Sequence, residues 1–220
     1  MKLNERGILV VLSGPSGVGK GTVRSALFKI ENHNLVYSVS VTTRKPRGQE
    51  KEGIDYYFVS EDEFIKKVDK GEFLEYTKFV GNYYGTLKES IDSKLSEGSE
   101  VILEIEVDGA LQVKEKMPGA VFVFIAPPSL KDLEKRLIER GTESSYELQA
   151  RLEKAKNELK LAYLYDYIVI NDTVENAADK ILAIIRAEHA KTERTINTYY
   201  KMLEVKQWKK TELDIHQLTN

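Results

Sequence analysis

Short runs of aliphatic residues alternate along the chain with longer segments in which apolar positions recur at helical spacing. The first run, residues 7–13, is almost entirely aliphatic, which is typical of a strand buried on both faces of a parallel sheet. The predicted core strands are 7–13, 37–41, 101–107, 121–126 and 167–170, and the predicted core helices are 22–30, 109–116 and 174 into the 190s. This alternation predicts an α/β fold, with a central parallel sheet in a three-layer core.

Between residues 41 and 89 the pattern changes. Short strand-like pieces at 56–59 and 73–80 are separated by a helix that opens at Ser60, with Glu63 at capping-box spacing. Mixed short strands and a helix, placed between two core strands, predict an inserted α+β lobe.

A second interruption follows the strand at 121–126. Two charged helices, 130–140 and 146–164, flank a glycine-containing link and are expected to form a hinged helical lid. The expected boundaries are about 1–40, 90–128 and 160–195 for the core, 41–89 for the lobe, 129–159 for the lid and 196–220 for a polar tail. Trp208 in this tail can pack on the body of the protein.

Composition excludes several classes of protein. The chain has 220 residues, which fits one folding unit, and its formal net charge of −2 supplies no overall basic field for collecting nucleic acid. No apolar run is long enough to span a membrane, and residues 1–6 lack the features of a signal peptide. The sequence contains no cysteine, which excludes disulfides and thiolate metal sites and fits the expected cytoplasmic location.

Residues 13–22 read Ser-Gly-Pro-Ser-Gly-Val-Gly-Lys-Gly-Thr and lie between a predicted strand and a predicted helix. This context is typical of a P-loop, whose glycines let backbone amides turn towards phosphates while Lys20 adds a point charge. The predicted ATP-binding residues of this P-loop NTPase-like core are Gly14, Pro15, Ser16, Gly17, Val18, Gly19, Lys20, Gly21 and Thr22. The hydroxyl of Thr22 comes one place later than usual, which leaves open whether it contacts Mg²⁺ directly or through water.

Four motifs in the predicted lobe, at 38–47, 53–59, 71–76 and 81–86, occur together and in order. Arg44 and Arg47 lie three apart on a turn stiffened by Pro46, so their guanidinium groups can converge on one phosphate. With these motifs and the P-loop, residues 7–186 resemble guanylate kinases. The resemblance implies that GMP is bound by Ser40, Arg44, Arg47, Tyr56, Glu75, Tyr84, Thr86 and Glu106, with Glu75 accepting the guanine N1–H and N2–H donors.

The segment Glu104-Ile105-Glu106-Val107-Asp108-Gly109 departs from the Asp-Ile-Asp-Val-Gln-Gly common in that family. Each of the first two carboxylates is one methylene longer, and Glu104 is expected to act with Thr22 at the Mg²⁺ ion. By the same resemblance, Arg136, Arg140 and Arg151 of the lid clamp the transferring phosphoryl group. Asn171 and Asp172 resemble positions near the ATP adenine, although a helix cap explains them almost as well.

The resemblance implies transfer of the γ-phosphoryl group of ATP to GMP, and also to dGMP, by in-line displacement with Mg²⁺ as cofactor. The expected catalytic residues are Lys20, Arg44, Arg136, Arg140 and Arg151. One alternative is an interaction module of the same fold that binds a phosphopeptide, but such modules typically lack the P-loop. A second alternative is a kinase for AMP or a pyrimidine nucleotide, which Glu75 disfavours. The expected partners are ATP and GMP, with no nucleic acid or membrane, and the oligomeric state is left open.

Overall fold

The centre of the protein is a parallel sheet of five strands in the order β2-β7-β1-β8-β9. The structure, a computed structural model, describes residues 6–31, 34–139 and 145–203. The strands are β1 (Leu9–Ser13), β2 (Leu35–Tyr37), β7 (Glu100–Glu104), β8 (Val121–Ala126) and β9 (Tyr167–Ile170). The predicted α/β class, with a central parallel sheet, is confirmed.

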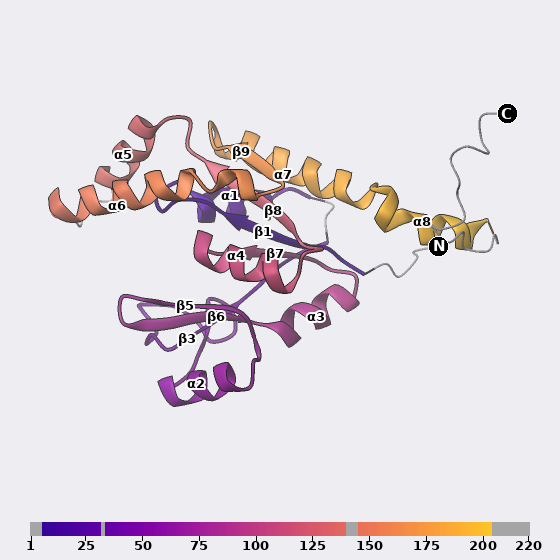
Figure 1. Ribbon diagram of the computed structural model, residues 1–220, viewed down its shortest axis with the longest axis horizontal. Coiled ribbons are helices and arrows are strands. Elements are labelled where there is room, and N and C mark those ends of the chain that lie inside the picture. Colours follow the sequence, from indigo (N-terminus) through magenta and orange to yellow (C-terminus); the bar gives the residue numbers. More distant parts are fainter. Residues whose placement is uncertain (1–5, 32–33, 140–144, 204–220) are drawn as a thin grey trace.

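Helices cover both faces of this sheet (Figure 1). Alternate residues of β1 separate into two clusters: Val10 packs with Val23 and Ile181, whereas Val11 packs with Val113. The first cluster joins the sheet to α1 (Lys20–Leu27) and α7 (Val174–His189), and the second joins it to α3 (Lys88–Ser96) and α4 (Val107–Lys116). All of β1 is buried, as its continuous apolar sequence predicted.

A second sheet, in the order β4-β3-β6-β5, forms the lobe below the central sheet in Figure 1. Its elements are β3 (Ser40–Thr42), β4 (Tyr56–Phe58), α2 (Glu61–Asp69), β5 (Phe73–Phe79) and β6 (Asn82–Leu87). The predicted capping box is present, because the Ser60 hydroxyl accepts a hydrogen bond from Glu63 N and the Glu63 carboxylate accepts one from Ser60 N. Phe64 of α2 is buried and stacks on Phe73, which gives the lobe a small core of its own.

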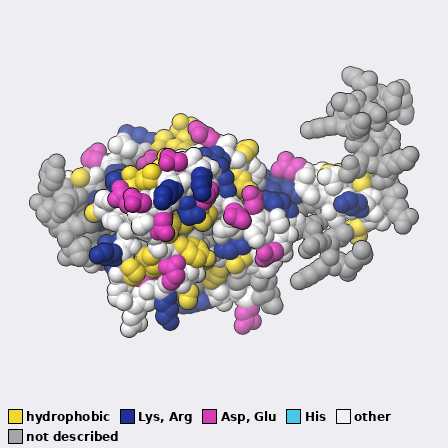
Figure 2. Space-filling model, turned by 90° about the horizontal axis from the view of Figure 1, so that it is seen from below, with side chains coloured by type: hydrophobic (Ala, Val, Ile, Leu, Met, Phe, Trp, Pro, Cys, Tyr) yellow, Lys and Arg dark blue, Asp and Glu magenta, His cyan; other side chains and the backbone are white. Residues whose placement is uncertain are grey.

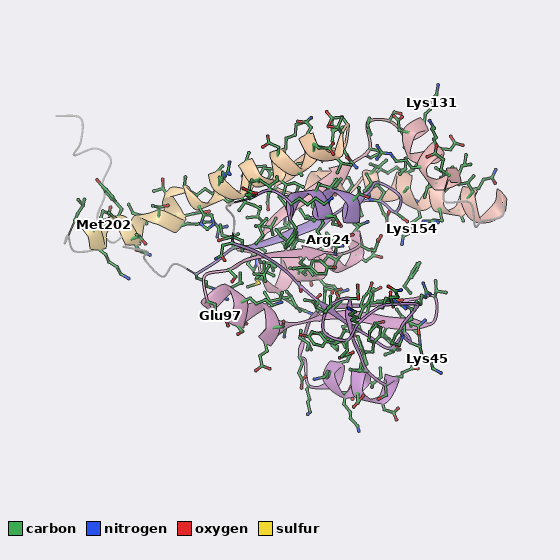
Figure 3. All side chains as sticks on the ribbon, turned by 180° about the vertical axis from the view of Figure 1, so that it is seen from behind. Arg24, Lys45, Glu97, Lys131, Lys154 and Met202 are labelled. Atoms are coloured by element: carbon green, nitrogen blue, oxygen red, sulfur yellow. The ribbon has the colours of Figure 1, made fainter. Side chains whose placement is uncertain are left out.

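Helices α5 (Leu130–Glu139) and α6 (Ser145–Leu159) lie on the other side of the central sheet from the lobe (Figure 1). They pack on each other through Leu133, Leu137 and Ala155. Figure 3 shows Lys131 and Lys154 on these helices, Lys45 on the lobe and Arg24 on the core. No helix in the described part of the chain is both long enough and apolar enough to cross a membrane.

Several predicted boundaries were wrong. The strand predicted at 37–41 is two strands in different sheets, β2 and β3, because the chain leaves the central sheet after Ser38 N bonds to Ile102 O. The helix predicted at 22–30 begins at Lys20 and ends at Leu27, and the strand predicted at 101–107 ends at Glu104. The helix predicted at 146–164 ends at Leu159 and is followed by a short 3₁₀ turn, Ala162–Leu164.

Three elements had no prediction: β6, α3 and α8 (Thr192–Met202). The last of these extends into the segment expected to be a polar tail. Trp208 and Arg140 lie outside the described residues.

Candidate active site

The predicted P-loop connects the end of β1 to the first residue of α1. Three of its glycines adopt positive φ angles: 147° at Gly14, 87° at Gly17 and 95° at Gly19. A Cβ at position 14 would lie 2.2 Å from Ile125 O, and one at position 17 would lie 2.6 Å from a Leu137 methyl carbon. The loop therefore requires glycine both for its backbone angles and for its close packing.

Lys20 is buried inside this loop. Its Nζ donates to Gly14 O at 2.7 Å and to Pro15 O at 3.4 Å, and lies 3.1 Å from Glu106 Oε1. The ammonium group is thus held in place by the loop's own carbonyls. Thr22 lies in the first turn of α1 with its side chain exposed.

The two described lid arginines contact the P-loop itself. Arg136 of α5 donates to Val18 O at 3.0 Å and to Asn171 O at 3.2 Å, and Arg151 of α6 donates to Ser16 Oγ at 2.7 Å. Asn171, which follows β9, is buried and donates from Nδ2 to Val18 O at 2.8 Å. The structure therefore brings Arg136, Arg151 and Asn171 together around the loop.

Asn171 and Asp172 do not provide the N-cap of α7. That position belongs to Thr173, whose side chain accepts from Asn176 N. Asp172 accepts hydrogen bonds from Thr173 N and from the Asn176 side chain, and these bonds lower the pKa of its carboxyl group. Among the described residues, the buried Asn171 Oδ1 has no hydrogen-bond donor.

In the lobe, Arg44 is buried and held by a carboxylate that sequence reasoning missed. Its two terminal nitrogens donate to the two Glu50 oxygens at 3.0 and 2.9 Å, and Glu50 Oε2 also accepts from Arg47 N at 2.8 Å. These bonds raise the pKa of Arg44 and lower that of Glu50. The Arg44 guanidinium lies over the Tyr56 ring, 5.3 Å from its centroid, and Tyr56 meets Tyr84 edge to face.

The four residues of the lobe predicted to bind the GMP phosphate differ in their exposure to solvent. The Arg47 side chain is exposed, whereas Arg44 is buried and both tyrosines are half-buried. Tyr56 also lines a cavity of about 530 Å³ shared with Arg24 and Tyr37, so open space separates this part of the lobe from α1 and β2.

Glu75 of β5 is a buried carboxylate at the junction of the lobe and the core. Thr86 Oγ1 donates to Glu75 Oε1 at 2.6 Å, and Gly109 of α4 leaves room for the other oxygen, since a Cβ there would lie 2.9 Å from Oε2. Burial is the main cause that raises the pKa of Glu75 to about 7. Ser40, half-buried at the start of β3, is the register partner of Tyr56 in β4.

Two further acidic residues lie beside the P-loop, Glu104 as the last residue of β7 and Glu106 two residues later. Glu104 Oε2 lies 3.4 Å from Arg24 Nε but has no hydrogen-bond partner in the described part of the chain. Burial raises the pKa of Glu104, and a Cβ at Gly21 would lie 3.5 Å from its Oε1, which is an ordinary contact. Glu106 is more exposed and is the N-cap residue of α4.

Acidic, basic and apolar side chains are interspersed on the face seen from below (Figure 2). This face therefore presents no broad positive field. Comparison with known proteins shows to which family the chain belongs. The family model described as Guanylate kinase matches residues 6–188.

The chain belongs to the guanylate kinase family. The guanylate kinase of Aster yellows witches'-broom phytoplasma (strain AYWB) is 58% identical over 205 residues, covering 93% of this chain and 97% of that protein. The guanylate kinase of Bacillus subtilis (strain 168) is 51% identical over 203 residues, covering 92% of this chain and 100% of that protein. A crystal structure of guanylate kinase from Anaplasma phagocytophilum has a TM-score of 0.71 at 37% identity, covering 87% of this chain and 91% of that one.

As a member of the guanylate kinase family, the chain is an enzyme of the nucleotide kinase class, and the predicted family is confirmed. The structure adds Glu50 to the predicted residues. Its sequence signal was available, since a carboxylate lies three residues after Arg47 and six after Arg44 in one short loop. That spacing has no fixed meaning outside a helix, which is why the pairing was missed.

Proposed function

We propose that the protein transfers the γ-phosphoryl group of ATP to GMP, giving ADP and GDP. The observation that carries this proposal is the presence of two separate anion-binding clusters with one buried carboxylate beside the second. The P-loop cluster around Lys20 suits a triphosphate, and the Arg44 cluster suits a monophosphate. The buried carboxylate is Glu75, which distinguishes guanine from adenine.

On the ATP side, the amides of the glycine-rich loop and Lys20 hold the phosphates. Arg136 and Arg151 contact the loop through Val18 and Ser16, so we expect their guanidinium groups to donate to phosphate oxygens of bound ATP. The Asn171 amide is fixed through Val18 O and offers its Oδ1 acceptor to the adenine amino group.

On the GMP side, Arg44, Arg47, Tyr56 and Tyr84 hold the phosphate. Glu50 occupies one edge of the Arg44 guanidinium, which leaves donors of the other edge for the phosphate oxygens. The base lies against Glu75, with Ser40, Thr86 and Glu106 completing its contacts. Guanine presents N1–H and N2–H to the carboxylate, whereas adenine N1 is an acceptor and would face another acceptor.

The residues beside the P-loop fit a Mg²⁺ ion. Glu104 Oε2 is a buried carboxylate oxygen without a hydrogen bond, and Mg²⁺ in such enzymes is usually held by one or two carboxylates together with substrate phosphates. Glu104 and the hydroxyl of Thr22 would hold it. When bound, Mg²⁺ neutralises charge on the phosphates of ATP. No group of three or more acidic or histidine ligands occurs among the described residues.

The reaction requires no covalent intermediate, because a phosphate oxygen of GMP attacks the γ-phosphorus of ATP directly. The residues contribute position and positive charge: Lys20 and the lid arginines stabilise the transferring group, and Arg44 with Arg47 directs the acceptor phosphate. The lobe and the lid lie on opposite sides of the core, so their approach excludes water that would otherwise hydrolyse ATP (Figure 3).

The test is ADP production from ATP and Mg²⁺, measured with GMP, dGMP, AMP, CMP, UMP or no acceptor. We expect turnover that depends on GMP or dGMP, is lost in Lys20→Ala and is retained in Lys29→Ala, which changes an exposed lysine shortly after α1. GMP binding by the folded protein without acceptor-dependent turnover would support the interaction-module alternative. Preference for AMP or a pyrimidine nucleotide would contradict the role of Glu75.

A further inference from the structure

Helix α4 of the core contacts the lobe strand that carries Glu75. Gly109, Gln112 and Lys116 are spaced at i, i+3 and i+7, so they lie on one side of this helix. All three face residues 73–76 of β5. The position of Glu75 is therefore set by α4 as well as by the lobe sheet.

Gln112 makes the most specific of these contacts. Its Oε1 accepts from Tyr76 N at 3.2 Å, and its Nε2 donates to Tyr76 O at 3.0 Å. Strand β5 is the last in the order β4-β3-β6-β5, so the outer edge of its backbone would otherwise be open. The side-chain amide of Gln112 pairs with both backbone groups of Tyr76 in the way that another strand would.

Lys116 holds the same strand on the other side of Glu75. Its Nζ donates to Leu74 O at 2.8 Å and to Phe73 O at 3.3 Å. The pairing of β5 with β6 is irregular between Phe73 and Glu75, and here the side chain of Leu74 enters the core cluster while that of Phe73 enters the lobe cluster. The backbone is thus anchored to α4 immediately before and immediately after Glu75.

This anchoring matters because a carboxylate that reads two donors needs an accurate orientation. Thr86 holds Oε1, and the missing side chain of Gly109 leaves space for Oε2. The N-cap residue of the same helix is Glu106, another predicted guanine contact. The same helix therefore joins both acidic residues that the proposed function places at the base.

We propose that Gln112 is a positioning residue for guanine recognition, which fixes β5 so that Glu75 can accept from guanine N1–H and N2–H together. The inference rests on the proposed function, in which Glu75 is the guanine acceptor. Gln112 itself touches backbone atoms of Tyr76 and is not assigned a contact with substrate.

The test compares GMP with IMP, which retains N1–H but lacks the N2 amino group. The ratio of kcat/KM for GMP to that for IMP reports whether the second hydrogen bond to the carboxylate forms. In Gln112→Leu we expect this ratio to fall about tenfold, as expected for loss of one hydrogen bond to a charged group, with KM for ATP unchanged. Glu115→Leu is the matched control, since it places the same side chain at an exposed position of α4.

A merely structural role would lower the melting temperature of Gln112→Leu and leave the GMP to IMP ratio at its wild-type value, and that result would overturn the proposal. If Gln112→Leu does not fold, Gln112→Asn decides, because it keeps the amide but shortens the side chain that reaches Tyr76 by one methylene, and it is expected to lower the ratio in the same direction. Failure of the proposed function is distinguishable, because the wild-type protein would then show no GMP-dependent turnover.

Discussion

Protonation of Glu75 is expected to control the affinity for GMP near neutral pH. Burial raises the pKa of this carboxyl group to about 7, and the hydrogen bond from Thr86 and the charge of Lys116 only partly oppose that rise. An ionised carboxylate can accept from N1–H and N2–H of guanine, whereas the protonated form loses acceptor capacity. GMP therefore selects the ionised form.

The size of the effect follows from the ionised fraction. With a pKa of about 7, roughly one-tenth of Glu75 is ionised at pH 6 and roughly nine-tenths at pH 8, so the apparent Kd for GMP is about tenfold higher at pH 6. The second ionisation of the GMP phosphate, with a pKa of about 6, adds a further change of about twofold in the same direction. The two contributions must be measured separately.

Isothermal titration calorimetry with GMP, without ATP, gives Kd across this pH range. Glu75→Gln is the control, because it keeps the phosphate contribution and removes the titrating carboxyl group. We expect weaker binding by the variant at pH 8 and a shallower dependence of its Kd on pH. Equal pH slopes for the wild-type protein and the variant would refute the reasoning.

The raised pKa of Glu75 affects the stability of the nucleotide-free protein in the opposite direction: affinity for GMP rises with pH, whereas stability falls. Because the native state retains the Glu75 proton between the ordinary value of 4.5 and about 7, the free energy of unfolding falls as pH rises through that window. Glu75→Gln removes this contribution. Urea unfolding at pH 5 and pH 8 should show a smaller decrease for the variant than for the wild-type protein.

Three other changes test the lobe. Glu50→Gln removes a negative charge near the GMP phosphate, which favours binding, but it also weakens the paired hydrogen bonds that orient Arg44, which opposes binding. We expect the loss of orientation to be the larger effect, so that KM for GMP rises about tenfold. Unchanged KM for ATP is the internal control, and a lower KM for GMP would show that charge dominates. Phe64→Ala removes the ring stacked 4.3 Å from that of Phe73 and should cost about 3–5 kcal/mol in urea unfolding. A loss below about 1 kcal/mol would contradict close packing of the lobe core. Ser60→Ala removes the N-cap of α2 and should cost about 1 kcal/mol by the same measurement, whereas no loss would mean that the cap contributes nothing.

Features that depend on neighbouring residues were predictable from the sequence. The buried strand, the glycine-rich turn and the helix that follows it are encoded within about 20 consecutive residues, although the helix begins at Lys20, two residues before its predicted start. The capping box of Ser60 and Glu63 was predicted for the same reason. Spacing and backbone preference act over one turn, so no knowledge of the rest of the fold was needed.

Other features arise from contacts between segments far apart in the chain. The strand predicted at 37–41 is divided because β2 pairs within the central sheet and β3 pairs within the lobe sheet. The contact of Arg136 with Val18 O joins residues 118 positions apart, and that of Gln112 with Tyr76 joins residues 36 positions apart. A glutamine or arginine on a helix has the same local pattern whether it faces water or a loop.

The sequence by itself therefore determined the P-loop and the α/β alternation, and its resemblance to guanylate kinases predicted the residues expected to bind the two nucleotides. Only the tertiary structure decided that Glu50 holds Arg44, that Asn171 is attached to the P-loop and that α4 anchors the strand carrying Glu75. The physical reason is that propensity and periodicity act locally, whereas side-chain partners are chosen when burial of apolar surface brings distant segments together.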